Sequence, residues 1–452
     1  MTDVKLRWLT LNQSVPEITP GVRRVLTNTA WLSGGQVMRL AIGLVVGVLV
    51  ARHLGPEQFG KYSFALALVA IASSISLLAA DSVVTREIVV NSRVTNVVLG
   101  SQFVLRALGS VLAVSIVLTM SWFQSTDSEA VLVAVAAVSL LFSPFEAIAT
   151  WFQAEQRPRA SVLSKTVVFF AASFARLVFV FYGASVVAFA TLFSVEAALS
   201  ALALVFAYHT YGERLWNWKV SRSCIAKLFY DSWPLLFAGV SSMLYMRLDI
   251  VMLNEMRGAH ETGIYSAATR ISEAWNFVPM ALLGALQPVL LRAKRDHHAL
   301  FMKRMEILYV CTAWASLVVA IIISLVSTSL VNILFGQEYQ QADSVLALHT
   351  WSAVAIYLGV VSSQYLLAEN LLKISMFRTM LGLAVNIALN LALIPEYGAQ
   401  GAAAATVISC FVATFSLILF KSTRSQATSM MQAFSPLRAM KLFRSPRSLW
   451  MQ

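Results

Sequence analysis

One short stretch of the sequence carries the residue types of a phosphate-binding loop. "GPEQFGKYS", from Gly55 to Ser63, reads G-x-x-x-x-G-K. With this spacing a P-loop presents backbone N–H groups and a lysine to nucleotide phosphates. The P-loop pattern then requires Ser or Thr, whose hydroxyl binds Mg²⁺, but this chain has Tyr62. The stretch is therefore either an incomplete nucleotide site or a structural turn that shares the spacing.

A second set of chemically interesting residues consists of ionisable side chains inside long apolar segments. Such groups are costly to place in a membrane, so each is a candidate for binding or transport. The basic ones are Arg39, Arg106, Arg176, Arg247 and Arg270, and the acidic ones are Asp81, Glu146, Glu196, Asp249 and Glu273. Structural ion pairs between helices are the competing role, and five charges of each sign do not decide between the two.

The composition indicates an integral membrane protein built from helices. Of the 452 residues, 58% are hydrophobic and only 12% are charged, whereas soluble domains carry roughly 25% charged residues. A helix of roughly 20 apolar residues crosses a bilayer and satisfies its own backbone groups there. Twelve segments meet this requirement: 28–52, 60–84, 98–122, 130–152, 163–183, 186–208, 232–254, 263–290, 305–328, 345–368, 376–394 and 401–420.

The basic residues fall on one side of these twelve segments. With the N-terminus inside, 26 of the 34 Lys and Arg residues lie in inside segments, and only Arg52, Lys61 and Arg257 lie in outside loops. This asymmetry follows the positive-inside rule and predicts a bacterial inner-membrane protein with both termini in the cytoplasm. It also explains the net charge of +12 without nucleic acid as a partner, because the charge is spread over seven separate segments.

The near-P-loop stretch occurs twice. "HLGPEQFGKYSFA" aligns with "MRGAHETGIYSAA" 203 residues later, so that Gly55, Gly60 and Tyr62 recur as Gly258, Gly263 and Tyr265, while Lys61 is not repeated. Both copies lie in an outside turn, where ATP is not available. Glycine ends a helix at positive φ and lets helices approach closely, and we expect both tyrosines at the membrane interface. The stretch is therefore predicted to be a helix-hairpin turn.

The repeat predicts the domain organisation and the fold class. An even number of segments separates the two copies, so the halves are parallel repeats related by an axis along the membrane normal. We expect an all-α membrane protein of twelve transmembrane helices in two six-helix lobes around a central cavity. The divisions are a cytoplasmic N-terminal segment 1–27, lobes 28–209 and 232–420, an inter-lobe linker 210–231, and a basic cytoplasmic tail 421–452.

Three stretches together resemble a known family. "NTAWLSGGQVMRLAIGLVVGVLVARHLGPEQFGKYSFA" is similar to the opening of Wzx-type O-antigen and exopolysaccharide flippases. "YMRLDIVML" with "GIYSAATRISEAWNFVP" resembles the start of their second half, and "LIPEYGAQGAAAAT" their last helix hairpin. These flippases belong to the multidrug/oligosaccharidyl-lipid/polysaccharide (MOP) exporter superfamily. The resemblance covers residues 28–420 and departs from the family near Asp81, where such chains often carry Gly-Leu.

The resemblance implies transport rather than enzymatic chemistry. Such a protein moves a polyprenyl-diphosphate-linked oligosaccharide from the cytoplasmic to the outer leaflet by alternating access, with the lipid bilayer and the polysaccharide polymerase machinery as its surroundings and partners. No cofactor or metal site is expected, since Cys224, Cys311 and Cys410 lack metal-ligand spacing.

Four arginines are expected to line the space between the lobes and hold the diphosphate: Arg39, Arg106, Arg247 and Arg270. A guanidinium stays charged and offers a fork of donors that matches phosphate oxygens. Arg39 lies on a stripe with Gly43 and Gly47, at four-residue spacing, which turns it toward protein rather than lipid. Arg270 and Glu273 are three residues apart and are expected to pair. Arg176 is the weaker candidate, because it can pair with Glu196.

The remaining site predictions concern carboxylates and amides. Asp249, Glu273 or Glu146 is expected either to carry a coupling ion or to form a structural pair. Asn386 and Asn390, one turn apart, are predicted either to contact sugar or to bond between helices.

Three other functions stay open at this point. An ion-coupled drug exporter of the same superfamily would need an anionic cavity. A lipid II flippase typically has additional helices. A membrane glycosyltransferase or polymerase would need clustered carboxylates or a large outside loop, and the sequence shows neither.

Overall fold

The computed structural model describes residues 20–78, 80–124 and 127–443, and for residues 20–37 it describes the backbone alone. Over these residues the chain is nearly all helical, and no strand is present in this part. The predicted all-α membrane fold is therefore confirmed. Most of the predicted N-terminal segment 1–27, with its basic residues Lys5 and Arg7, lies outside the described residues.

The helices of the first half precede residue 211, and those of the second half begin at residue 222. The first half contains α1 (Pro20–Ser76), α2 (Asp81–Val90), α3 (Thr95–Gln124), α4 (Asp127–Ala137), α5 (Glu146–Ala154), α6 (Pro158–Phe181) and α7 (Val186–Thr210). The second half contains α8 (Arg222–Arg257), α9 (Ala259–Ala274), α10 (Phe277–Asp296), α11 (His298–Leu334), α12 (Ala342–His349), α13 (Ser352–Ala368), α14 (Leu372–Phe415), α15 (Arg424–Gln432) and α16 (Pro436–Phe443).

The number of membrane-length helices differs from twelve for a structural reason. Among the described residues, nine helices are long and apolar enough to cross a membrane, or ten if the bent pair Ala259–Gly284 and Val289–Asp296 counts as one span. Two of the nine each contain two expected segments, because α1 and α14 continue through breaks at Gly55 and Gly398. The expected segments therefore overlap these helices, but the count of twelve separate spans is not confirmed.

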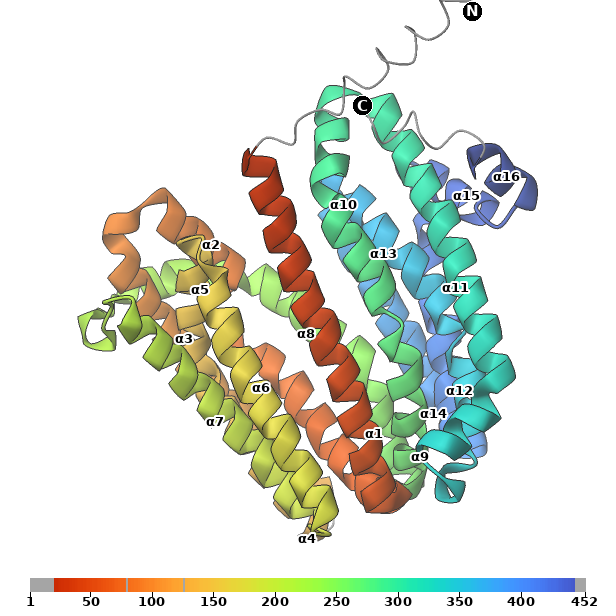
Figure 1. Ribbon diagram of the computed structural model, residues 1–452, viewed down its shortest axis with the longest axis horizontal. Helices are drawn as coiled ribbons and strands as arrows, with labels where there is room; N and C mark the ends of the chain where they lie inside the picture. Colours follow the sequence, from red (N-terminus) through yellow and green to blue (C-terminus); the bar gives the residue numbers. More distant parts are fainter. Residues whose placement is uncertain (1–19, 79, 125–126, 444–452) are drawn as a thin grey trace, which may run out of the picture.

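The two halves pack together at one end of the molecule and separate at the other (Figure 1). One hydrophobic core joins residues of α1 to residues of α8, α9 and α14, around the breaks at Gly55 and Gly258. At the opposite end each half has a core of its own, one from α2, α3, α5 and α7 with the start of α8, and one from α10, α11, α13 and α15. The lobes therefore form a V whose vertex holds the repeated glycine turns.

Helix α8 belongs to both arms of the V. Near its start, Ser232 accepts a hydrogen bond from the backbone N–H of Ala80 at 3.0 Å, and Lys227 donates to Glu87 at 2.7 Å. Its C-terminal part packs instead against α9 and α14 of the second half. Pro234 lies inside the helix between these two regions. The helix thus crosses from the first lobe to the second within one continuous element, as Figure 1 shows.

The two copies of the repeated turn have the same backbone conformation. Gly55 has φ 70° and ψ 168°, and Gly258 has φ 85° and ψ 178°. Residues other than glycine rarely adopt this region. The glycine prediction for these turns is therefore confirmed at both positions.

The two turns also pack against each other reciprocally. A methyl group on Gly60 would overlap the carbonyl group of Ala259, and one on Gly263 would overlap that of Pro56. Because Pro56 and Gly60 correspond to Ala259 and Gly263 in the repeat, the contact maps onto itself under a two-fold rotation, like an isologous dimer interface. Tyr339 adds a 2.7 Å hydrogen bond from its hydroxyl to the Ala51 carbonyl across the same junction.

The expectation that Tyr62 and Tyr265 lie at the membrane interface is wrong. Their exposed fractions are only 6% and 1%, and both belong to the core at the vertex. Close backbone packing at the glycines draws the following residues into the interior, where the Tyr265 hydroxyl donates to Asp249.

We predict that Gly60→Ala and Gly263→Ala each destabilise the protein by about 1–3 kcal/mol, the usual cost of overpacking. The obstructing atoms belong to the backbone, so no rotamer change relieves the overlap. Gly239→Ala is the matched control, because a methyl group there meets nothing within 4 Å and alanine favours a helix interior by about 1 kcal/mol. Unfolding of purified protein in mixed detergent micelles measures the difference. Wild-type stability in both vertex variants would contradict the contact.

Candidate functional site

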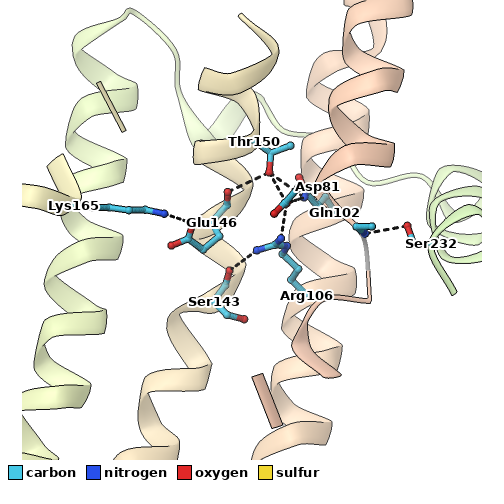
Figure 2. Close-up of polar contacts among 9 residues, drawn as sticks. Asp81, Gln102, Arg106, Ser143, Glu146, Thr150, Lys165 and Ser232 are labelled. Carbon is cyan, nitrogen blue, oxygen red and sulfur yellow. Dashed lines mark hydrogen bonds and ion pairs between the residues drawn. The ribbon is translucent and has the colours of Figure 1, made fainter. Parts of the chain in front are cut away.

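The buried charge of the first lobe is an ion pair set in a polar network. Arg106 of α3 is 1% exposed, and its Nη2 lies 2.5 Å from Oδ1 of Asp81, the first residue of α2. The same oxygen accepts hydrogen bonds from Gln102 at 3.1 Å and from Thr150 at 2.7 Å. Arg106 also donates to the Ser143 carbonyl at 3.3 Å. Figure 2 shows these groups converging on Asp81.

This network joins α2, α3 and α5 through Asp81, while the buried Arg106 Nε–H has no acceptor among the described residues. The structure places Arg106 inside the first lobe, between α2, α3 and the segment before α5, rather than on a surface between the lobes. Its partner Asp81 is the residue at which the sequence departs from the flippase pattern. Glu146 lies beside the network and pairs with Lys165 at 2.5 Å (Figure 2). Arg106 and Glu146 therefore both form structural ion pairs, with Asp81 and Lys165 respectively, which is one of the predicted alternatives.

Arg270 occupies a different position, because it reaches across the junction of the lobes. From α9 of the second half, its guanidinium packs directly against the α carbon of Gly47 on α1 and lies 5.6 Å from the centre of the Phe59 ring. Only a residue without a side chain leaves room for it, so the predicted glycine stripe of α1 accommodates this cation. Tyr62 and Arg176 are its electrostatic neighbours on the first lobe.

The expected pairing of Arg270 with Glu273 is wrong. Glu273 Oε2 instead lies 3.6 Å from Arg247 Nη1, so a residue of α9 pairs with one of α8. The side chains of both are about one third exposed, at 32% and 33%. Arg270 makes no ion pair among the residues the structure describes. The weaker prediction, that Arg176 pairs with Glu196, is confirmed.

Arg39 is the fourth predicted phosphate ligand. It lies on α1 between the exposed residues Met38 and Leu40, and its own side chain is half-buried. In the described part of the chain it has no carboxylate partner. Arg39 and Arg270 thus have no carboxylate partner among the described residues, and the Arg247 side chain is about one third exposed. Arg106, in contrast, is buried.

Asp249 anchors a second buried polar network in the other lobe. It is 6% exposed, accepts the Ile250 backbone N–H at 2.8 Å and the Tyr265 hydroxyl, and lies 3.4 Å from the Thr406 hydroxyl. It makes no close ion pair among the described residues, and Arg247 acts on it only as an electrostatic neighbour.

The predicted amide pair continues this network along α14. Asn390 donates to Asn386 at 3.0 Å, and Asn386 donates to the Ser409 hydroxyl at 3.4 Å. Both amides are buried, and Asn390 Oδ1 has no donor among the described residues. The Asn386–Ser409 bond joins the two arms of α14 on either side of the break at Gly398, whereas the Asn390–Asn386 bond lies within one arm. No group of three His, Cys, Asp or Glu side chains suited to a metal occurs in the described segments.

Sequence reasoning did not select Arg378 as a candidate. It is the seventh residue of the helix that begins at Leu372. Its bonds to Ser362 and Ser363 connect it to α13. The signal available in the sequence was its place within the expected segment 376–394.

Comparisons with known proteins agree with this architecture. A profile of the family described as polysaccharide biosynthesis protein matches residues 25–294. No curated protein sequence matches the chain. Among solved structures, the inward closed conformation of lipid II flippase MurJ aligns with 91% of this chain and 92% of its own, at a TM-score of 0.69 and 14% identity.

Two structures of multidrug resistance MATE family transporters of the MOP superfamily also align. The inward-facing one has a TM-score of 0.65 at 15% identity, covering 88% of this chain and 96% of its own. The outward-facing one has a TM-score of 0.53 at 16% identity, covering 89% and 96%. At these identities the likeness concerns the fold, and the fold is closer to the inward-facing arrangement.

We predict that Asp81→Asn destabilises the protein by about 1–3 kcal/mol, because it leaves the enclosed Arg106 cation without a counter-ion. Glu57→Gln is the matched control. Glu57 pairs with Lys61 at 3.3 Å but is 64% exposed, and such surface pairs contribute about 0–1 kcal/mol. Unfolding in mixed micelles compares the two. Equal small effects would show that Asp81 does not hold Arg106 in place.

Proposed function

The chain belongs to the polysaccharide biosynthesis protein family, and we propose that it flips a polyprenyl-diphosphate-linked oligosaccharide across the bacterial inner membrane. The observation that carries this proposal is Arg270, a cation without a carboxylate partner among the described residues, held at the junction of two separating lobes. The task is transport for O-antigen or exopolysaccharide synthesis, with a polymerase as the consumer of the product, and no enzymatic step is required of this chain.

The orientation follows from charge and from the shape of the V. Basic residues follow α2, end α10 and begin α14; they include Arg93, Lys294 and Lys373. Helices α2 and α10 lie at the separated end of the V (Figure 1). By the positive-inside rule this end faces the cytoplasm. The vertex with Gly55 and Gly258 then faces outward, both termini lie in the cytoplasm, and the structure corresponds to an inward-facing state.

The diphosphate is assigned to Arg270 and Arg247, with Arg39 contributing from α1. These residues come from three helices that run between the arms, α9, α8 and α1. Guanidinium groups hold phosphate oxygens through paired, charge-assisted hydrogen bonds. Arg247 is released for this role when Glu273 gives way to phosphate, since their 3.6 Å separation exceeds that of a close ion pair. Arg106 is assigned a structural role.

Alternating access needs the vertex to open when the cytoplasmic arms close. The reciprocal glycine contact joins only two pairs of backbone groups, but opening there would also part the core that α1 shares with α8 and α9 and break the hydrogen bond from the Tyr339 hydroxyl to the Ala51 carbonyl. Arg270 would leave Gly47 in that step and become available to ligand from the outer side. Arg270 would therefore bind the diphosphate, and its contact with Gly47 would differ between the inward-open and outward-open states.

A drug exporter of the same superfamily is the second candidate, because multidrug MATE structures align with most of the chain. Cationic drugs require carboxylates that face the substrate. Asp249 is enclosed by Tyr265 and Thr406, and Glu273 faces Arg247. The groups at the lobe junction favour an anionic substrate.

We predict that Arg270→Gln and Arg247→Gln reduce flipping at least tenfold, measured by complementation of flippase-deficient strains and by surface polysaccharide at matched expression. Gly47→Ala should have a similar effect without loss of stability, because the added methyl displaces the end of a flexible side chain, the Arg270 guanidinium. Gly43→Ala is the matched control one turn away, where the nearest atom would lie at 3.7 Å. Full activity in all three variants would refute the arginine assignment.

We further propose that Asp249 carries the coupling cation, since its carboxylate lies among the oxygens of Tyr265 and Thr406 and forms no close ion pair in the described segments. Asp249→Asn should leave a slow flipping rate that no longer falls when ionophores collapse the sodium and proton gradients. Asp343→Asn is the control, because that carboxylate bonds Thr328 at 2.9 Å near the outward end. Gradient-dependent flipping in Asp249→Asn would contradict the coupling role.

A further inference from the structure

Arg378 stands out among the arginines of the second lobe by the neutrality of its partners. Nη1 donates to the Ser362 hydroxyl at 2.5 Å and to the Gly359 carbonyl at 3.4 Å, and Nη2 donates to the Ser363 hydroxyl at 2.7 Å. All three acceptors are uncharged. The only ionisable side chains in its electrostatic surroundings are Tyr309 and Tyr245, so no carboxylate balances it within the described part of the chain.

Three other arginines in the membrane segments are paired with a carboxylate. Arg106, Arg176 and Arg247 each have a carboxylate within 4 Å, namely Asp81, Glu196 and Glu273. An uncompensated cation in a membrane segment is unfavourable and marks a functional position by default. Arg378 therefore either carries a permanent cost or is balanced by an anion that binds it.

The hydrogen bonds of Arg378 leave one edge of the guanidinium open. A guanidinium has five N–H donors, and the three observed bonds use both Nη1 hydrogens and one on Nη2. The Nε–H and the second Nη2–H remain without an acceptor among the described residues. These two donors form the side of the fork that grips an oxyanion in bidentate fashion. The Arg378 side chain is only half-buried, so a ligand can approach this edge.

The two serines orient the guanidinium and do not compete for the ligand. Ser362 and Ser363 each donate their own hydroxyl to the Gly359 carbonyl at 2.9 Å, so their oxygens are free only to accept from Arg378. The fork is thus fixed on α13 with its open edge turned away from the serines.

A second polar group near Arg378 lacks a partner. The Tyr309 hydroxyl on α11 is fully buried, since Tyr309 is 0% exposed, and it makes no hydrogen bond. A buried hydroxyl without a partner costs about 1–3 kcal/mol, and few such groups occur in folded proteins. Tyr309 is an electrostatic neighbour of Arg378, so one oxyanion could accept from both.

We propose that Arg378 and Tyr309 form a second anion site, positioned by Ser362 and Ser363, for a compact oxyanion of the lipid-linked saccharide. The site lies on α11, α13 and α14, beside the second lobe's own core, which includes Tyr309 and Leu358. Resting on the proposed function, it would receive the substrate from the inner leaflet before the lobes move. The shared ligand chemistry is a phosphate or a carboxylate, supplied by the lipid diphosphate or by an acidic sugar.

Calorimetric titration of the purified full-length protein tests this, with inorganic pyrophosphate and sodium glucuronate as separate probes. We expect Arg378→Gln to weaken one class of sites at least tenfold and Arg378→Lys to restore it only in part, because lysine keeps the charge without the fork. Loss of pyrophosphate binding identifies the diphosphate as the source, and loss of glucuronate binding alone identifies a sugar carboxylate.

Tyr309→Phe separates binding from structure. A purely structural role predicts unchanged binding and equal or greater stability, because the change removes an unpartnered buried hydroxyl. The proposal predicts binding weakened several-fold, with equal or greater stability of the protein measured without the probe. Tyr357→Phe is the control in the same lobe, since that hydroxyl donates to the Trp275 carbonyl at 2.6 Å, and it should leave binding unaltered.

The outcomes separate this inference from the proposed function. Probe binding that persists in Arg247→Gln and Arg270→Gln but disappears in Arg378→Gln would refute the diphosphate assignment and support the second site. Wild-type affinity and stoichiometry for both probes in Arg378→Gln would overturn the inference, as would the failure of the wild-type protein to bind either probe.

Discussion

The arrangement of the whole molecule depends on a contact in which no side chain takes part. At the vertex, the backbone of Pro56 meets Gly263 and the backbone of Ala259 meets Gly60. Any larger residue would hold the two halves apart, and the shared core around them could not close. The position of each arm relative to the other, and hence the distance from Arg270 to Gly47, follows from this backbone-to-backbone approach.

The distribution of charge then divides the arginines by role. Where a carboxylate begins or lines a neighbouring helix, as Asp81 does for Arg106, the pair fastens helices within one lobe. Where no carboxylate forms an ion pair among the described residues, as for Arg270 and Arg378, the cation lies at the lobe junction or against α13 of the second lobe. A bilayer solvates neither paired nor unpaired arginines well. An arginine without a nearby carboxylate is therefore a stronger candidate for anion binding than a paired one.

Much of the fold could be predicted from the sequence, because hydrophobic length, charge asymmetry and the repeat at Gly55 and Gly258 each reflect a constraint that acts along the chain. The partners of buried groups could not be predicted. Spacing shows which residues of one helix share a face, so Arg270 and Glu273 were expected to pair, but it carries no information about a neighbouring helix. Arg247 on α8 lies closer to Glu273, and the glycine at position 47 offers Arg270 another place. Tyr62 and Tyr265 were misplaced for the same reason, since the depth of burial depends on how closely two distant turns approach.

The path of α8 constrains how the arms can move. Its first turns are bonded to the first lobe through Ser232 and Lys227, while its end is built into the second around Asp249. Because α8 is bonded to both lobes, the lobes can rotate relative to each other only if α8 bends. Pro234 removes a backbone hydrogen bond from the helix, and around Gly239 nothing packs within 4 Å of a β-carbon position. The segment of α8 between Pro234 and Gly239 is therefore where the helix can bend. Its stiffness would set how far, and how fast, the two arms can approach each other at the separated end.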